Sequence, residues 1–452
     1  MPATKFRFRA AVCLLGLVAG LHGLLYVPFA GHRLGDTESY VVAAQAILHG
    51  SYTTPLGAVD VTGLRTPRQA RGAPERQTYR TPGYPLLLAI TGGGGSGAPT
   101  DAIIAVQMLL AGATTIVLTL LARRLWSERV ALVTGALTAL DPFPKHYVTR
   151  ILSEVLAGLL VAVAAYVFVR AWQGRTSTWW VATGLALAAL TLTRPLFAPA
   201  LPLSALGAVL SRGDARARMR SLGAVVLGSA VLLVPWLGWT TAATGRPALS
   251  TFGEGWNLLL AAHGEGLHHT AVQVASSGSY RRDFLSVHRF APTAAELRSD
   301  PDAHPHYLVR ADGEQRRLAR NLYVDRIEAE PLAVLGEIAY RSYFLWEAHE
   351  DWVQPAWLLP FLRGFDWLLL VLGFAGVMLA MRAGGAARAL GIFLLVFTLV
   401  NGIHHVEARY AMPVRGLYVA FIALALSVAT ERVRLRRAAR KPLAEHWQEN
   451  GR

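Results

Sequence analysis

Long runs of apolar residues without charge are the feature that most constrains this sequence. The runs at residues 10–30 and 102–122 each have the roughly 20 residues that an α-helix needs to cross the hydrocarbon core of a membrane. Across the 452 residues, 53% of the side chains are hydrophobic and 16% are charged, whereas soluble domains carry about 25% charged residues. We therefore expect an all-α polytopic membrane protein.

About ten runs are expected to be transmembrane helices. They are residues 10–30, 102–122, 130–140, 151–169, 176–193, 195–211, 221–245, 367–381, 390–403 and 416–430. Proline disfavours helix at the residue before it, so the Arg194-Pro195 step predicts a hairpin between two of these runs. The first run is expected to be a retained span and not a cleaved signal peptide, because no clean small-x-small cleavage site follows it.

The charges of the short loops predict the orientation. With the N-terminus in the cytoplasm, every short cytoplasmic loop is basic, as the positive-inside rule requires. These loops hold Arg123, Arg124 and Arg129, then Arg170 and Arg175, then Arg212, Arg216, Arg218 and Arg220, then Arg382 and Arg388, and finally the basic tail at residues 432–441. The net charge of +15 then reflects topology, and no nucleic acid partner is expected. We predict a multi-pass protein of the cytoplasmic (inner) membrane.

Two long segments are predicted on the outer face, residues 31–100 (the first loop) and about 246–366 (the second loop). The predicted organisation has three parts. Residues 1–245 form an N-terminal transmembrane catalytic module that includes the first loop. Residues 246–366 form an outer-face region with surface helices, and residues 367–452 form C-terminal transmembrane helices with a basic cytoplasmic tail.

Charged clusters near the outer ends of the spans are candidates for function, because charge at membrane depth is costly. They are Asp36 with Glu38, the arginines from Arg65 to Arg80, the segment from Asp141 to Glu154, Arg194, and the segment from His404 to Arg409. They come from distant parts of the chain. We predict that helix packing brings them around one cavity.

Simpler interpretations exist for several of these residues. Asp36 could be the N-cap of a short interfacial helix. Glu154 could form an internal ion pair with Arg150 on the same helical face. The arginines of the first loop could be solvated. His404, His405 and Glu407 could bind zinc, but adjacent histidines point in different directions on a helix. The single cysteine, Cys13, excludes an intrachain disulfide, and no phosphate-binding loop is present.

Five short motifs follow one another along the chain: GDTESY at residues 35–40, RTPGYPLLL at 80–88, SEVL at 153–156, TRP at 193–195 and RYAMP at 409–413. Together they resemble the GT-C membrane glycosyltransferases, in particular the family 39-like group that includes protein O-mannosyltransferases and the lipid A aminoarabinose transferase. No motif of the second loop matches.

The resemblance implies a GT-C fold, a polyprenyl-phosphate-linked sugar donor, a lipid, glycan or protein acceptor, and an active site that faces the periplasm or exterior. It implies that Asp36 is the general base or orients the acceptor. Candidate catalytic acids are Asp36, Glu38, Asp141 and Glu154, and candidate substrate-binding residues are Tyr40, Arg80, Tyr84, Lys145, Arg194, Arg409 and Tyr410. A divalent metal is possible, because some relatives use one, and no other cofactor is expected.

The chemistry of these residue types agrees with the resemblance. Transfer from a lipid phosphate needs a base for the acceptor proton, and a carboxylate can supply it. The leaving phosphate needs positive charge, and displacement in one step would invert the anomeric carbon. A transporter or flippase of lipid-linked sugars is the alternative, although the repeated halves common in transporters are not evident. A non-catalytic scaffold would instead tolerate substitution of Asp36, Glu38 and Arg409 together.

Overall fold

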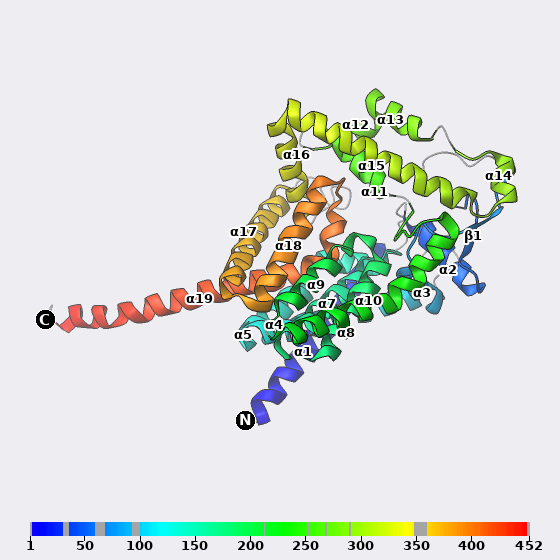
Figure 1. The fold of residues 1–452 in the computed structure, drawn as a ribbon. Coiled ribbons are helices and arrows are strands. Elements are labelled where there is room, and N and C mark those ends of the chain that lie inside the picture. The colour runs from blue at the N-terminus through cyan, green and yellow to red at the C-terminus, as the bar shows by residue number, and fades with distance from the viewer. Residues whose placement is uncertain are drawn as a thin grey trace.

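The computed structural model describes residues 2–29, 36–58, 68–92, 100–174, 176–211, 213–251, 253–266, 269–288, 291–347 and 359–449 (Figure 1). Within these ranges, seven helices are long and apolar enough to cross a membrane. They lie in α1 (Pro2–His22) with η1 (Gly23–Phe29), α4 (Asp101–Leu125), α7 (Glu154–Gly174), α10 (Ala215–Thr244), α17 (Leu359–Ala383), α18 (Gly385–Ile403) and α19 (Met412–Glu449). This confirms an all-α polytopic membrane protein.

Three predicted spans correspond to shorter apolar helices. They are α5 (Glu128–Leu140), α8 (Ser177–Thr193), and α9 (Ala200–Leu210), which follows the turn η4 (Pro195–Phe197). The chain breaks between α8 and η4 at Arg194, whose backbone is extended at φ −145° and ψ 107°. The predicted break at Arg194-Pro195 is therefore confirmed, and α8 and α9 contact each other as a hairpin requires.

Glycines allow the helices of the bundle to approach closely. A Cβ atom built on Gly184 of α8 would lie 2.2 Å from the carbonyl oxygen of Val225, and one on Gly228 of α10 would lie 2.2 Å from that of Val181. Small residues at such contacts let backbones approach in the absence of a hydrophobic driving force between helices. Larger side chains, among them Trp180, are fully buried in the core of the same bundle.

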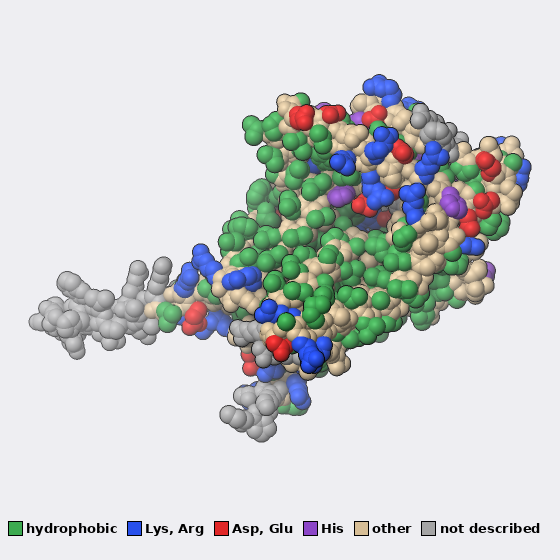
Figure 2. Space-filling view, in the orientation of Figure 1, with side chains coloured by type: hydrophobic (Ala, Val, Ile, Leu, Met, Phe, Trp, Pro, Cys, Tyr) green, Lys and Arg blue, Asp and Glu red, His purple; other side chains and the backbone are tan. Residues whose placement is uncertain are grey.

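The ends of the helices form two faces. At one face, Arg124 Nη1 at the end of α4 donates to Gln173 Oε1 near the end of α7 at 3.1 Å, and Arg129 at the start of α5 pairs with Glu431 at 3.3 Å. We call this the basic face. The opposite ends, which include Glu154 and Arg194, form the loop face. Figure 2 shows a broad hydrophobic belt between two zones of charged side chains.

Two helices of the first loop lie at the loop face. α2 (Thr37–Leu48) begins directly after Asp36, and α3 (Gly83–Ile90) begins after Pro82. A Cβ on Gly83 would lie 2.5 Å from Thr193 Oγ1 and 2.7 Å from the carbonyl oxygen of Leu192. Only glycine permits this approach, which places the start of α3 against the end of α8 and therefore near Arg194.

In the described part of the second loop, six helices lie across the loop face (Figure 1). They are α11 (Glu254–Ala262), α12 (Ala271–Ser276), α13 (Gly278–His288), α14 (Ala294–Ser299), α15 (Ala303–Ala329) and α16 (Pro331–Phe344). The remaining elements are η2 (Arg68–Ala70), α6 (Pro142–His146), η3 (Tyr147–Thr149), η5 (Ala408–Ala411) and the antiparallel strands β1 (Thr53–Pro55) and β2 (Pro74–Arg76).

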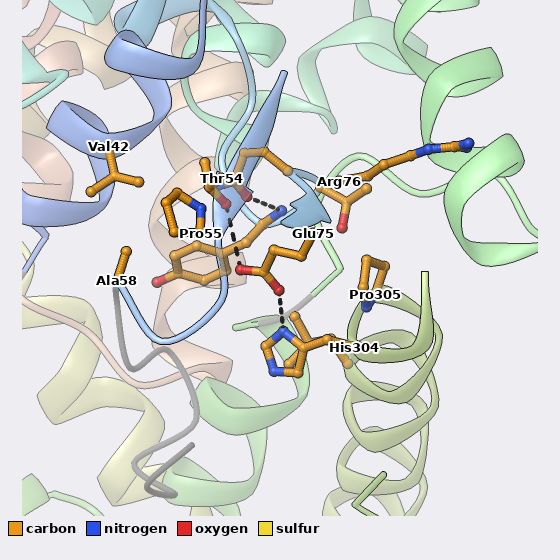
Figure 3. Close-up of a pocket in the computed structure, with 12 residues that line it drawn as sticks. Val42, Thr54, Pro55, Ala58, Glu75, Arg76, His304 and Pro305 are labelled. Carbon is orange, nitrogen blue, oxygen red and sulfur yellow. Dashed lines mark hydrogen bonds and ion pairs between the residues drawn. The ribbon is translucent and has the colours of Figure 1, made fainter. Parts of the chain in front are cut away.

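A hydrogen bond and an ion pair join the two loops. Glu75 of β2 lies between Thr54 of β1 and His304 of α15, with 2.5 Å between Glu75 Oε2 and His304 Nδ1 (Figure 3). The neighbouring Arg76 Nε lies 3.4 Å from Asp302 Oδ1. The first loop is thereby held both to the membrane-spanning bundle and to the second loop.

Candidate functional site

A cavity of about 1330 Å³ lies between the membrane-spanning helices and the helices of the second loop. Its polar and aromatic lining includes Asp36, Tyr40, Tyr79, Arg80, Glu154, Arg194, Glu254, Trp256, Asn257, Tyr280, Arg281, Arg316, Asn401, His404, His405, Glu407, Arg409 and Tyr410. Pro195, Leu196, Pro199 and Val400 add an apolar wall. In Figure 2, charged and histidine side chains gather where the hydrophobic belt meets the second loop.

Asp36 is the point where two arginines meet. Its Oδ1 atom pairs with Arg80 Nη2, and its Oδ2 atom lies 2.9 Å from Arg409 Nη2. Asp36 occupies the N-cap position of α2, but its side chain makes no capping hydrogen bond. Burial alone would raise the pKa of Asp36, but the two guanidinium groups outweigh this effect and hold the pKa well below its usual range. Asp36 is therefore ionised.

Arg80 is fixed in place by aromatic rings and by a hydroxyl group. Its guanidinium carbon lies 4.6 Å from the ring centroid of Tyr40 and 4.5 Å from that of Tyr79, and its Nε donates to Ser39 Oγ at 2.8 Å. Such cation–π contacts stabilise a charged group that is removed from water. Tyr84, in contrast, is fully buried, with its ring against Tyr40, and does not line the cavity.

Glu154 and Arg194 form a second ion pair on the cavity wall. Arg194 Nη1 lies 2.7 Å from Glu154 Oε1, and Glu154 is 1% exposed. The other carboxylate oxygen, Oε2, is buried and has no hydrogen-bond partner among the described residues. The predicted alternative of an internal ion pair is correct, but the partner comes from the α8–η4 turn and not from Arg150. The Nη2 atom of Arg150 lies 3.3 Å from His146 Nε2.

Charges of alternating sign connect the second loop to Asp36. His405 Nδ1 lies 2.7 Å from Glu265 Oε1, and its Nε2 lies 3.7 Å from Glu407 Oε1. Glu407 Oε2 accepts a hydrogen bond from Arg409 Nε. These contacts link six side chains, here called the charge chain, in the order Glu265, His405, Glu407, Arg409, Asp36 and Arg80.

Protonation states along the charge chain follow from these contacts. Burial alone would lower the pKa of His405, but hydrogen bonds and attraction to Glu265 and Glu407 raise it to about 9. Burial would raise the pKa of Glu407, yet His405 and Arg409 lower it to about 2. His405 is therefore a cation at neutral pH, and positive and negative side chains alternate along the charge chain.

Metal binding receives no support from the donor set of this cavity. Within the described ranges, no three His, Cys, Asp or Glu side chains are grouped so that they could hold a metal ion. Both oxygens of Asp36 face arginines, and the two ring nitrogens of His405 face different carboxylates. The use of a divalent metal stays an open hypothesis.

Several predicted site residues lie elsewhere. Asp141 is buried at the start of α6, where its Oδ2 accepts a 2.6 Å hydrogen bond from Arg415 Nε and its Oδ1 accepts one from the Phe143 amide. Lys145 is 2% exposed and donates to the carbonyl oxygen of Thr138. Glu38 is exposed on α2. None of the three lines the cavity. Arg65 lies outside the described residues.

The structure also adds residues that the sequence did not indicate. Glu265, Trp256 and Asn257 come from the second loop, where no motif was recognised, and Trp256 packs its ring edge-on against His405. A histidine–glutamate contact across 140 positions leaves no local pattern in a sequence.

Comparisons with known proteins agree with this architecture. The family model described as dolichyl-phosphate-mannose-protein mannosyltransferase matches residues 85–239, from α3 into α10. No curated protein matches the chain in sequence. Among solved structures, the oligosaccharyltransferase AglB of Archaeoglobus fulgidus, in complex with an inhibitory peptide and a dolichol-phosphate, is 14% identical with a TM-score of 0.55. The match covers 97% of this chain and 52% of that one.

The apo form of an oligosaccharyltransferase of Archaeoglobus fulgidus gives the same identity, coverage and TM-score. ArnT from Cupriavidus metallidurans bound to undecaprenyl phosphate is 14% identical over 94% of this chain and 77% of its own, but its TM-score of 0.37 is too low to support an argument. The chain spans about half the length of the oligosaccharyltransferase. The predicted resemblance to GT-C glycosyltransferases is confirmed for the fold.

Proposed function

We propose that this multi-pass membrane protein is an inverting glycosyltransferase that moves a sugar from a polyprenyl-phosphate donor to a lipid, glycan or protein acceptor. The observation that carries the proposal is Asp36 held between Arg80 and Arg409 on the wall of a large cavity. A base for the acceptor and cations for a phosphate then lie side by side. The active site would face the periplasm or exterior, since the arginine-rich loops lie at the opposite face.

The donor fits the two kinds of cavity wall. Arginine forks suit phosphate oxygens, so Arg80 and Arg409 would bind the donor phosphate. The polyprenyl chain would lie against the apolar wall formed by Pro195, Leu196 and Val400, near the hydrophobic belt. A lipid donor would not have to leave the membrane to reach the site.

Donor binding would also activate Asp36. The two guanidinium groups hold its pKa low, which makes the carboxylate a weak base. A phosphate that engages the same arginines reduces their effect on Asp36, and its own negative charge raises the pKa of the carboxylate towards the ordinary range. The donor would thus convert the ion-paired aspartate into a base.

The reaction is a single displacement. The acceptor hydroxyl oxygen forms a bond to the anomeric carbon as the bond from that carbon to the phosphate oxygen breaks. The acceptor proton passes to Asp36, and the electron pair of the broken bond leaves with the phosphate. Arg80 and Arg409 stabilise the charge that develops on the phosphate. Attack on the face opposite the leaving group inverts the anomeric configuration.

The test uses the purified full chain and a panel of polyprenyl-phosphate sugars carrying mannose, glucose or arabinose, with envelope extract as acceptor source. Mass spectrometry follows loss of donor and release of polyprenyl phosphate. Asp36→Asn is expected to lower the rate by about 10²–10⁴-fold while the protein still folds. The control Asp101→Asn, at the exposed start of α4, retains the wild-type rate. Full activity of Asp36→Asn excludes this mechanism, and lipid flipping in proteoliposomes without turnover indicates a flippase.

A further inference from the structure

We infer that Trp256 and Asn257 form the subsite that binds the sugar ring of the donor. The inference rests on the proposed function and specifies the part of the cavity that distinguishes a sugar-bearing lipid from the bare lipid phosphate. Both residues line the cavity and belong to α11, in the second loop, where the sequence carries no recognised motif.

The start of α11 is held firmly by α15. Asp312 of α15 is buried, and its Oδ1 accepts hydrogen bonds from the backbone amides of Gly253 at 3.1 Å and Gly255 at 2.8 Å. A Cβ on Gly255 would lie 2.3 Å from the carbonyl oxygen of Asp312, so the two helices are in backbone contact at this point. Trp256 and Asn257 follow immediately and are therefore positioned by rigid elements.

The same two residues contact the charge chain. The backbone amide of His405 donates to the carbonyl oxygen of Asn257 at 3.0 Å. The ring of Trp256 meets the ring of His405 edge-on, with 5.7 Å between centroids. His405 is linked through Glu407 to Arg409, the arginine that we assign to the donor phosphate. A sugar attached to that phosphate would therefore lie within reach of α11.

The unsatisfied atoms indicate what binds there. Asn257 Oδ1 is buried and has no hydrogen-bond partner among the described residues, and the same holds for Oε2 of Glu154, which is 1% exposed. Both line the cavity, and both only accept hydrogen bonds. Buried acceptors normally have a donor. A deprotonated phosphate supplies none, whereas a sugar supplies several hydroxyl donors and an apolar C–H face that suits the ring of Trp256.

The experiment measures binding of defined lipids to the full chain in detergent. The probes are undecaprenyl phosphate and undecaprenyl phosphate carrying mannose, glucose or arabinose, and the readout is affinity by native mass spectrometry. Wild-type protein is expected to bind at least one sugar lipid more tightly than the bare lipid phosphate. Asn257→Ala is expected to weaken binding of that sugar lipid about tenfold, the effect of one lost hydrogen bond, and to leave the bare lipid within twofold.

Two further variants serve as controls for side-chain size and for position. Asn257→Leu preserves the size of the side chain and should reproduce the loss seen with Asn257→Ala. Asn321→Ala, at an exposed position of α15, should change neither affinity. Alanine favours helix, so unfolding of Asn257→Ala is not expected.

The other outcomes contradict either the sugar subsite alone or the proposed function as well. If wild type binds sugar lipid and bare lipid equally, or if Asn257→Ala and Asn257→Leu retain the preference, the subsite is wrong while the proposed function stands. Equal weakening of the binding of both lipids in the Asn257 variants also excludes the donor-sugar assignment. If wild type binds none of the four lipids, the proposed function fails together with the subsite.

Discussion

Arg409 Nη2 lies 2.9 Å from Asp36 Oδ2, so a turn near the end of the chain and the start of the first loop share one carboxylate. Arg80 takes the other oxygen of the same carboxylate. Three segments that are far apart in sequence therefore depend on one another for charge balance. Because the cluster is partly removed from water, its interactions are stronger than those of surface ion pairs.

The pair formed by Glu154 and Arg194 predicts a large loss of stability when one partner is removed. Glu154→Gln leaves the largely buried Arg194 without its carboxylate partner, and breaking such a pair costs about 3–5 kcal/mol. Thermal unfolding followed by circular dichroism in detergent measures the loss. The double variant Glu154→Gln/Arg194→Gln should lose less than the sum of the single variants.

An exposed ion pair supplies the control for this experiment. Arg317 and Glu314 of α15 pair at 2.8 Å on the surface, where such contacts are worth about 0–1 kcal/mol. Glu314→Gln should therefore unfold close to wild type. A Glu154→Gln variant as stable as Glu314→Gln contradicts the prediction.

Asp141 should behave as a structural residue and not as a catalytic one. It pairs with Arg415 away from the cavity, so Asp141→Asn is expected to lower the unfolding temperature while kcat and KM of the folded protein stay within about twofold of wild type. Steady-state kinetics of Asp141→Asn, Asp36→Asn and wild type, measured side by side, test this prediction. A loss of kcat as large as that of Asp36→Asn would restore Asp141 as a catalytic candidate.

The contact between α8 and α10 should not tolerate a methyl group. Gly184→Ala would place a Cβ 2.2 Å from a backbone oxygen, so the helices must separate, and overpacking of this kind costs about 1–3 kcal/mol. Gly223→Ala on α10 is the matched control, because nothing lies within 4 Å of its added Cβ. The unfolding temperature should fall in Gly184→Ala and stay close to wild type in Gly223→Ala. An equal shift in both variants would contradict the close packing of α8 and α10.

His405 predicts a specific dependence of stability on pH. Its folded pKa of about 9 lies above its ordinary value of 6.5, so its contribution is fully present below about pH 6.5 and is lost as the pH rises through about 9. Glu407, with a pKa of about 2, stays ionised throughout. The difference in unfolding temperature between wild type and His405→Gln should shrink between pH 7 and pH 10. A constant difference would show that His405 is not a cation in the folded protein.

The sequence predicted much of the site because a residue at the end of a predicted transmembrane span must lie at a known face of the membrane. Asp36, Arg80, Glu154, Arg194 and Arg409 each follow or precede an apolar run, and alternation of the spans places all of them at one face. Their catalytic and binding roles stay predictions. The break at Arg194 was visible because proline acts locally on the residue before it.

The site residues that were predicted wrongly or missed depend on the direction in which a side chain points and on contacts between distant parts of the chain. Asp141 and Lys145 lie at the correct face, but the sequence does not tell which way around the bundle a side chain points, and Arg415 of α19 binds Asp141 instead. Trp256 and Asn257 reach the cavity because Asp312 fixes the start of α11 through contacts that span 57 and 59 positions. No periodicity within a helix reports such a contact.

The alternation of sign along the charge chain has an evolutionary consequence. Loss of any inner member leaves two neighbours of like charge facing each other, so a viable change there requires a second change nearby. Homologous chains should therefore vary in matched sets at positions 265 and 405, and at positions 36, 80 and 409, even though these positions belong to separate stretches of the polypeptide.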